Sequence, residues 1–143
     1  NYTPENRLVM VSKRYRKLDT LRAELEAQGD GVFDAPDGAE IGVIGWGSTE
    51  GTIAEVVEAL RRDGTPVAHL QPKVLNPLPV ATVNRFIAPL KKVIVLEENY
   101  TGQLAQHLRA NVDFGKTELV RANDCSGLPF TPDQVRAAIA ANA

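Results

Sequence analysis

Two stretches of the chain share one plan, in which an apolar strand runs into a glycine-containing turn that opens a helix. The first is Ile-Gly-Val-Ile-Gly-Trp-Gly-Ser-Thr-Glu-Gly at 41–51, and the second is Val-Ile-Val-Leu-Glu-Glu-Asn-Tyr-Thr-Gly-Gln-Leu at 93–104. Strands joined through helices run parallel to one another in a sheet. We therefore expect both turns to lie at one edge of one sheet.

The segments around these two stretches continue the alternation of strands and helices. We expect further strands at 66–70 and 118–122, and helices at about 49–62, 80–87 and 102–111. Thr52 and Glu55 have the spacing of a capping box for the first of these helices. A last helix is indicated by Thr131-Pro-Asp-Gln134, which combines a cap, a first-turn proline and a third-position glutamine. The alternation predicts an α/β fold with a parallel sheet covered by helices on both faces.

Residues near the N-terminus have the period of a long amphipathic helix that ends near Gly29. Its apolar side chains recur every three or four residues, at Leu8, Val11, Tyr15, Leu18, Leu21 and Leu25. We expect residues 1–30 to form a linker helix that packs on the surface of the domain, and residues 31–143 to form the α/β domain. The segment 33–39 is rich in Asp, Pro and Gly and is predicted to be a connector.

The same helix carries a cluster of basic side chains. Six of the 16 basic residues lie there, namely Arg7, Lys13, Arg14, Arg16, Lys17 and Arg22. Such a cluster is most often a solvated helix face. Its functional interpretation is a docking surface for acidic residues of another domain, centred on Lys13, Arg14, Arg16 and Lys17.

Composition excludes several classes of protein. With 143 residues and 43% hydrophobic content, the chain can build one domain with its own core. A net charge of −2 argues against a nucleic-acid-binding protein. Cys125 is the single cysteine, which excludes an internal disulfide and an iron–sulfur cluster held by this chain alone, and favours a reducing compartment. No apolar run approaches the ~18–20 residues of a membrane span, so we expect a cytoplasmic protein.

The glycines of the first turn allow two interpretations. Gly45-Trp-Gly47 followed by Gly51 resembles a dinucleotide-binding fingerprint, but the spacing is G-x-G-x-x-x-G and the bulky Trp46 lies in the turn. We favour glycines that serve only tight strand-to-helix geometry. The alternative is an anion- or nucleotide-binding regulatory module that uses the backbone N–H groups of Gly47, Ser48, Thr49 and Gly51. The charge of Glu50 counts against a phosphate there and favours a single carboxylate or no ligand.

No catalytic or metal constellation stands out. Glu97 and Glu98 follow a buried strand, where α/β proteins place functional groups, and a buried glutamate can act as a general base. They are joined by no nucleophile, paired histidine or metal set, so we predict no catalytic residue and no metal ligand in this chain. Gly29-Asp-Gly31 resembles the start of a diphosphate motif of thiamine enzymes, but it lacks the downstream Asn. It is better interpreted as a helix C-cap followed by a turn.

Four motifs stand in register with a known family. They are Lys-Arg-Tyr-Arg-Lys-Leu at 13–18, Gly-Trp-Gly-Ser-Thr at 45–49, Asn-Pro-Leu-Pro at 76–79 and Glu-Glu-Asn-Tyr-Thr-Gly-Gln-Leu at 97–104. In order and spacing they resemble the C-terminal domain of the α subunit of 2-oxoacid:ferredoxin oxidoreductases, especially the 2-oxoglutarate type. Weaker similarity runs to the C-terminal domains of transketolases. The resemblance covers nearly the whole chain and is least familiar after Cys125.

The resemblance implies a three-layer α/β/α fold with a mixed, mostly parallel sheet, similar to the transketolase C-terminal domain. The intact enzymes convert a 2-oxoacid and coenzyme A to acyl-CoA and CO2 and pass two electrons to ferredoxin. They use thiamine diphosphate with Mg2+ and iron–sulfur clusters, none of which we expect this chain to bind. The implied partners are the remaining domains of the α subunit, the β subunit and, through the intact enzyme, ferredoxin. The isolated domain is predicted to be inactive.

Within this resemblance, the second turn is expected to serve the fold or an interface more than chemistry. Its candidate interface residues are Glu97, Asn99, Gly102 and Gln103. A glycine beside a helix start allows close approach of two backbones, and the amide side chains can both donate and accept hydrogen bonds.

Overall fold

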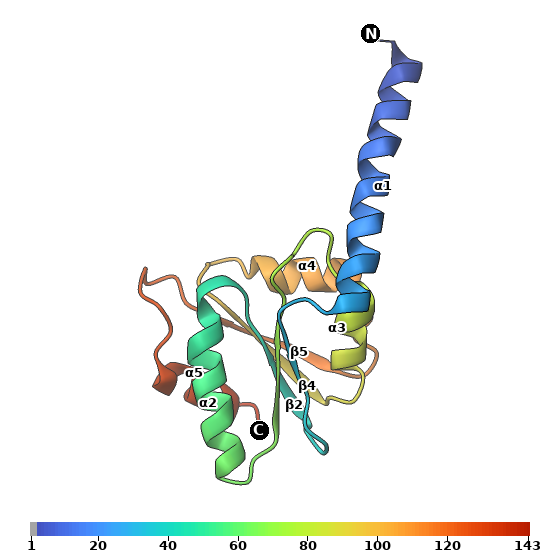
Figure 1. The fold of residues 1–143 in the computed structure, drawn as a ribbon. Coiled ribbons are helices and arrows are strands. Elements are labelled where there is room, and N and C mark those ends of the chain that lie inside the picture. Colours follow the sequence, from blue (N-terminus) through green and yellow to red (C-terminus); the bar gives the residue numbers. More distant parts are fainter. Residues whose placement is uncertain (1–2) are drawn as a thin grey trace.

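The computed structural model describes residues 3–143 and consists of one mixed sheet with helices on both faces and a long helix that projects from it (Figure 1). Residues 1–2, at the start of the predicted linker helix, lie outside the described residues. The helices are α1 (Pro4–Gln28), the 3₁₀ turn η1 (Gly47–Thr49), α2 (Glu50–Arg62), α3 (Val80–Ile87), α4 (Gln103–Asn111) and α5 (Pro132–Ala140). The strands are β1 (Val32–Asp34), β2 (Ile41–Ile44), β3 (Val67–Gln71), β4 (Lys92–Glu97) and β5 (Glu118–Asn123).

The strands follow the order β1-β3-β2-β4-β5 across the sheet. All neighbours are parallel except β1, which pairs antiparallel with β3. The predicted α/β fold with a mixed, mostly parallel sheet is confirmed. The strand β1 corrects the prediction of a connector at 33–39, because three residues beside a Pro-Asp-Gly segment are too short to show a strand period.

The core lies in two layers, one on each face of the sheet. Because successive side chains of a strand point to opposite faces, Val43 and Ile44 of β2 enter different layers, as do Ile94 and Val95 of β4. Buried side chains of α3 and α4 fill one layer, and those of α2 and α5 fill the other. The central strands therefore read as continuous apolar runs, which explains why the sequence predicted them well.

Helix α1 meets the rest of the domain only near its C-terminal end (Figure 1). It ends at Gly29, which has a φ of 85° and donates its N–H to the carbonyl of Leu25. No residue of α1 is buried, and the side chains of Leu8 and Tyr15 are 70% and 64% exposed. Near its end, the carboxylate of Glu26 accepts a 3.0 Å hydrogen bond from the backbone nitrogen of Ala81 in α3. The division of the chain at residue 30 stays a prediction.

None of the helices described for residues 3–143 is both long and apolar enough to cross a membrane.

The two predicted capping boxes have different outcomes. The box of α5 is confirmed, because the backbone nitrogen of Gln134 donates to the Thr131 hydroxyl and the Gln134 side chain accepts from the Thr131 nitrogen. The box of Thr52 and Glu55 is wrong. The chain enters α2 through η1, so Thr52 already lies inside the first turn and the preceding turn is closed by the buried Thr49 hydroxyl.

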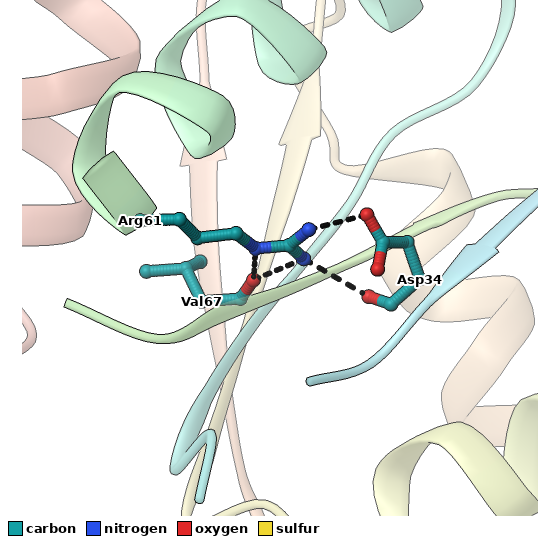
Figure 2. A network of polar contacts seen from close by, with 3 residues as sticks. All are labelled: Asp34, Arg61 and Val67. Carbon is teal, nitrogen blue, oxygen red and sulfur yellow. Dashed lines mark hydrogen bonds and ion pairs between the residues drawn. The ribbon is translucent and has the colours of Figure 1, made fainter. Parts of the chain in front are cut away.

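Arg61 ties the short edge strand to the sheet (Figure 2). Its Nε donates to the carbonyl of Val67 at 2.9 Å, where β3 begins. Its Nη2 donates to the Asp34 carbonyl at 3.3 Å, and its Nη1 forms an ion pair with the Asp34 carboxylate at the end of β1. One guanidinium therefore joins the C-terminal turn of α2 to two neighbouring strands.

Candidate functional site

The candidate site lies at the carboxyl ends of β2 and β4. These strands are parallel neighbours, yet the chain leaves β2 toward β3 on one side, and β4 leads to β5 on the other. The connections after them therefore diverge, and such a switch point is where α/β sheets bind ligands and partners. The prediction that both turns lie at one edge of one sheet is confirmed.

Two adjoining hollows make up this crevice. The first, of about 320 Å³, is lined by Trp46, Gly47, Ser48, Thr49, Glu98, Asn99 and Gln103. The second, of about 250 Å³, shares Trp46 and Gln103 and is completed by Leu75, Asn76, Leu104 and His107. Three of the four sequence motifs therefore contribute side chains to one crevice.

Hydrogen bonds from nearby side chains close the first turn. The Thr49 hydroxyl accepts from the Trp46 nitrogen and donates to the Trp46 carbonyl, both at 3.1 Å. The Gln71 side chain donates to the carbonyl of Gly47 at 3.2 Å. Gly47 has a φ of 62°, in the left-handed region that favours glycine. These contacts fix the turn without a ligand.

The three glycines of the turn differ in what they require. A Cβ at Gly45 would lie 2.4 Å from both the Ile53 Cδ1 and the Thr49 Oγ1, so close packing demands a glycine there. Gly47 has open space and is required only by its backbone conformation. Gly51 has neither crowding nor a positive φ, so its local structure permits other residues.

Glu97 is fully buried and serves the start of α4. Its carboxylate accepts hydrogen bonds from the backbone nitrogens of Leu104 at 2.6 Å and Ala105 at 3.0 Å, and from the Asn99 side chain at 2.9 Å. The side-chain oxygen Oδ1 of Asn99 accepts in turn from the backbone nitrogens of Gly102 at 2.7 Å and Gln103 at 3.1 Å. A negative charge at a helix N-terminus is favourable, so this network stabilises the second turn rather than preparing a base.

Glu98 points to the other turn. One carboxylate oxygen accepts from the Ser48 hydroxyl at 3.2 Å, and the other accepts from the Phe130 nitrogen at 3.4 Å. The chain's own carboxylate therefore lies beside the first turn. A bound phosphate or carboxylate would meet this like charge, which disfavours the anion-binding alternative.

The two histidines occupy different places. His69 on β3 is buried, and this burial lowers its pKa from the ordinary value of 6.5 while Gln71 opposes the shift. Within the part of the chain that the structure describes, its Nε2 makes no hydrogen bond. The Nε2 of His107 lies 2.9 Å from the carbonyl of Leu75 at the wall of the second hollow. Within residues 3–143, neither histidine is hydrogen-bonded to a nucleophilic side chain.

Comparison with known proteins agrees with this geometry. Residues 39–135 match the family of the pyruvate:ferredoxin oxidoreductase core domain II. The chain belongs to this family. The chain is 38% identical over 147 aligned residues to the 2-oxoglutarate oxidoreductase subunit KorA of Mycobacterium tuberculosis, covering 98% of this chain and 21% of that subunit. It therefore spans about a fifth of the length of this curated relative.

Two solved structures show the fold. A 2-oxoglutarate:ferredoxin oxidoreductase from Magnetococcus marinus, with 2-oxoglutarate, coenzyme A and succinyl-CoA bound, matches at 33% identity and a TM-score of 0.80 over 99% of this chain and 24% of that chain. A split-gene transketolase, an inactive β4 tetramer, shares the fold at 17% identity and a TM-score of 0.55, over 78% of this chain and 41% of that one. The predicted resemblance and the transketolase-like fold are confirmed.

The Gly-Asp-Gly segment at 29–31, which precedes the residues that match the family, does not fit thiamine diphosphate with Mg2+. The Asp30 carboxylate accepts from the backbone nitrogens of Lys73 at 3.1 Å and Val74 at 2.9 Å. A Cβ at Gly31 would lie 1.9 Å from the carbonyl oxygen of Gln71, so the backbone is already packed against its neighbour. Over residues 3–143, no three His, Cys, Asp or Glu side chains gather where a metal ion could be held. The predicted helix C-cap and turn are confirmed.

Some of the predicted residues lie outside the crevice. Lys13, Arg14, Arg16 and Lys17 are exposed on the projecting part of α1 and line neither hollow (Figure 1). Sequence reasoning also missed that Gln71 supports the first turn and that Glu98 bonds to Ser48. The pattern gave no signal for either contact, because both join residues from separate elements.

Proposed function

We propose that this chain is the non-catalytic C-terminal domain of the α subunit of a thiamine-diphosphate-dependent 2-oxoacid:ferredoxin oxidoreductase that uses 2-oxoglutarate. The intact enzyme converts the 2-oxoacid and coenzyme A to acyl-CoA and CO2 and reduces ferredoxin. Thiamine diphosphate with Mg2+ supplies the decarboxylation chemistry, and iron–sulfur clusters carry the electrons. In this proposal other domains and the β subunit hold these groups and coenzyme A, and the enzyme is cytoplasmic.

The hydrogen bonding of Glu97 is the observation that best supports a non-catalytic role. It is the one carboxylate buried at the carboxyl end of the central strands, within the part of the chain that the structure describes. Its two oxygens accept three hydrogen bonds that order the second turn and the start of α4. A general base needs a lone pair directed at substrate, and here the carboxylate oxygens accept from two backbone nitrogens and the Asn99 side chain.

The interface role is supported by two exposed features. The projecting part of α1 presents unburied apolar side chains together with Lys13, Arg14, Arg16 and Lys17. The rim of the crevice presents Ser48 and Gln103. We assign both surfaces to contacts with the remaining α-subunit domains or the β subunit. Asn99, Gly47 and Thr49 line the first hollow, while Gly102 and Gly51 belong to the two turns beside it.

Calorimetric titration tests whether the cofactor binds to the rest of the enzyme and not to this chain. The 143-residue chain is titrated with thiamine diphosphate and Mg2+, and the assembled α and β subunits serve as the positive control. We expect no binding heat for the chain and stoichiometric binding for the assembly. Stoichiometric, micromolar binding by the chain alone would overturn the proposal.

A further inference from the structure

We infer that the crevice between Trp46 and Glu98 receives the guanidinium group of an arginine presented by another domain or subunit of the enzyme. The inference rests on the proposed function, because an interface domain needs a neighbour, and it specifies the chemistry of that neighbour. Three features of the first hollow support it, namely its charge, its aromatic wall and its polar rim.

The first feature is the Glu98 carboxylate, whose charge no ion pair among residues 3–143 neutralises. Glu98 is exposed, and within residues 3–143 its carboxylate accepts two long hydrogen bonds, at 3.2 Å from Ser48 and 3.4 Å from the nitrogen of Phe130. Of the ion pairs found among residues 3–143, none includes Glu98. The lining of the hollow contains this carboxylate and no basic side chain. The hollow is therefore negative and complementary to a cation.

The second feature is the aromatic wall. Trp46 lines both hollows and is 38% exposed, so part of its surface is open to a partner. Tryptophan has the most favourable ring for a cation over its face. A tryptophan and a carboxylate lining one hollow suit a planar cation better than a compact ammonium, because guanidinium both stacks on aromatic rings and forms paired hydrogen bonds.

The third feature is the polar rim. Gln103 is exposed, lines both hollows, and uses its backbone nitrogen, rather than its side chain, in the turn. Its side-chain carbonyl can accept a further N–H of a guanidinium, which carries five donors. Asn99 does not compete for this role, because both ends of its amide already bond within the turn.

The single tryptophan of the chain makes the inference measurable, because fluorescence excited selectively at tryptophan reports on the crevice and excludes the three tyrosines. The 143-residue chain is titrated with N-acetyl-arginine amide, and with N-acetyl-norleucine amide and inorganic phosphate as comparison probes. We expect a saturable change with the arginine probe only. Glu98→Gln should weaken that response about tenfold, since a charge-assisted hydrogen bond is lost. The matched control Glu55→Gln, an exposed glutamate of α2 outside the hollow, should leave it unchanged.

Three results of the titration would overturn the inference. They are a saturable response to phosphate in place of arginine, an arginine response that Glu98→Gln leaves unaltered, and no saturable response to any probe. Melting temperatures of both variants confirm that the fold is intact.

Assembly of the enzyme separates this inference from the proposed function. Glu98→Gln in the α subunit should weaken the contact of this domain with its neighbour about tenfold, and Glu55→Gln should not. If Glu98→Gln assembles as wild type does, the inference fails and the proposed function stands. If an α subunit without this domain assembles and turns over normally, the proposed function fails.

Discussion

The Glu97 carboxylate accepts a 2.6 Å hydrogen bond from the backbone nitrogen of Leu104, so the last residue of β4 is joined directly to the first turn of α4. The neighbouring Glu98 has no comparable bond and remains exposed. Two adjacent glutamates at the end of one strand thus have opposite roles, one inside the fold and one at its surface.

Replacing Glu97 by alanine should destabilise the domain by about 2–4 kcal/mol, because two buried backbone N–H groups lose their acceptor. Glu98→Ala removes an exposed carboxylate with long hydrogen bonds and should change the free energy of unfolding by less than about 1 kcal/mol. Urea unfolding of the two variants measures the difference. Equal stability of both would show that Glu97 does not hold the helix start.

The glycines of the first turn should respond differently to substitution. Gly47→Val places a β-branched residue at a φ of 62° and should reduce stability by about 1–2 kcal/mol or more. Gly51→Ala lies in the first turn of α2 with open space around it, and should be neutral or stabilising by up to about 1 kcal/mol. Thermal unfolding of both variants checks this. An unchanged melting temperature for Gly47→Val, with loss of partner binding, would show that Gly47 serves an interface and not the fold.

His69 should make the domain less stable in mild acid. Burial lowers its pKa in the folded state, so the unfolded chain takes up a proton near pH 6.5 that the folded chain resists. The contribution of His69 to stability is therefore full well above pH 6.5 and is lost as the pH falls through 6.5 toward the lower pKa of the folded state, by at most about 1.4 kcal/mol per pH unit for one group. Urea unfolding at several pH values should show a flatter dependence for His69→Gln. The same slope in both proteins would assign the effect to other groups.

Arg61 should control the edge strand. Arg61→Ala removes the contacts to Val67 and Asp34, and should speed backbone hydrogen exchange in β1 while the central strands stay protected. Its exposed neighbour in α2 provides the control, Arg62→Ala, which should leave exchange unchanged. Equal protection of β1 in the two variants would mean that strand pairing alone holds this edge.

The sequence predicted the elements whose physical signals are local. Strands β2 and β4 are buried on both faces and appear as unbroken apolar runs, and α5 carries its complete cap at Thr131 and Gln134. The strand β1 has three residues and depends on pairing with β3 and on Arg61, so its own sequence carries no period. The bounds of α2 were predicted within one residue, but its cap was placed at Thr52 because the 3₁₀ turn that precedes the helix has no signature in the sequence.

The sequence predicted where the candidate site lies but not the contacts of its side chains. Alternation of strands and helices placed the two turns at one edge, which the parallel pairing of β2 and β4 bears out. Whether Glu97 or Glu98 faces the interior depends on where β4 ends, and that boundary cannot be read from two identical residues. The contact of Ser48 with Glu98 joins residues of separate elements and has no local signature.

Turnover is the most direct test of the central claim that this chain is a non-catalytic domain of a larger enzyme. The measurement is coenzyme A-dependent reduction of ferredoxin by 2-oxoglutarate, made on the 143-residue chain alone, on the assembled α and β subunits, and on an assembly that lacks this domain. We predict turnover only for the complete assembly, because the chain orders its buried carboxylate for structure and, in the proposed function, other domains and the β subunit hold the cofactors. Turnover by the chain alone, or full turnover by the assembly without it, would contradict the claim.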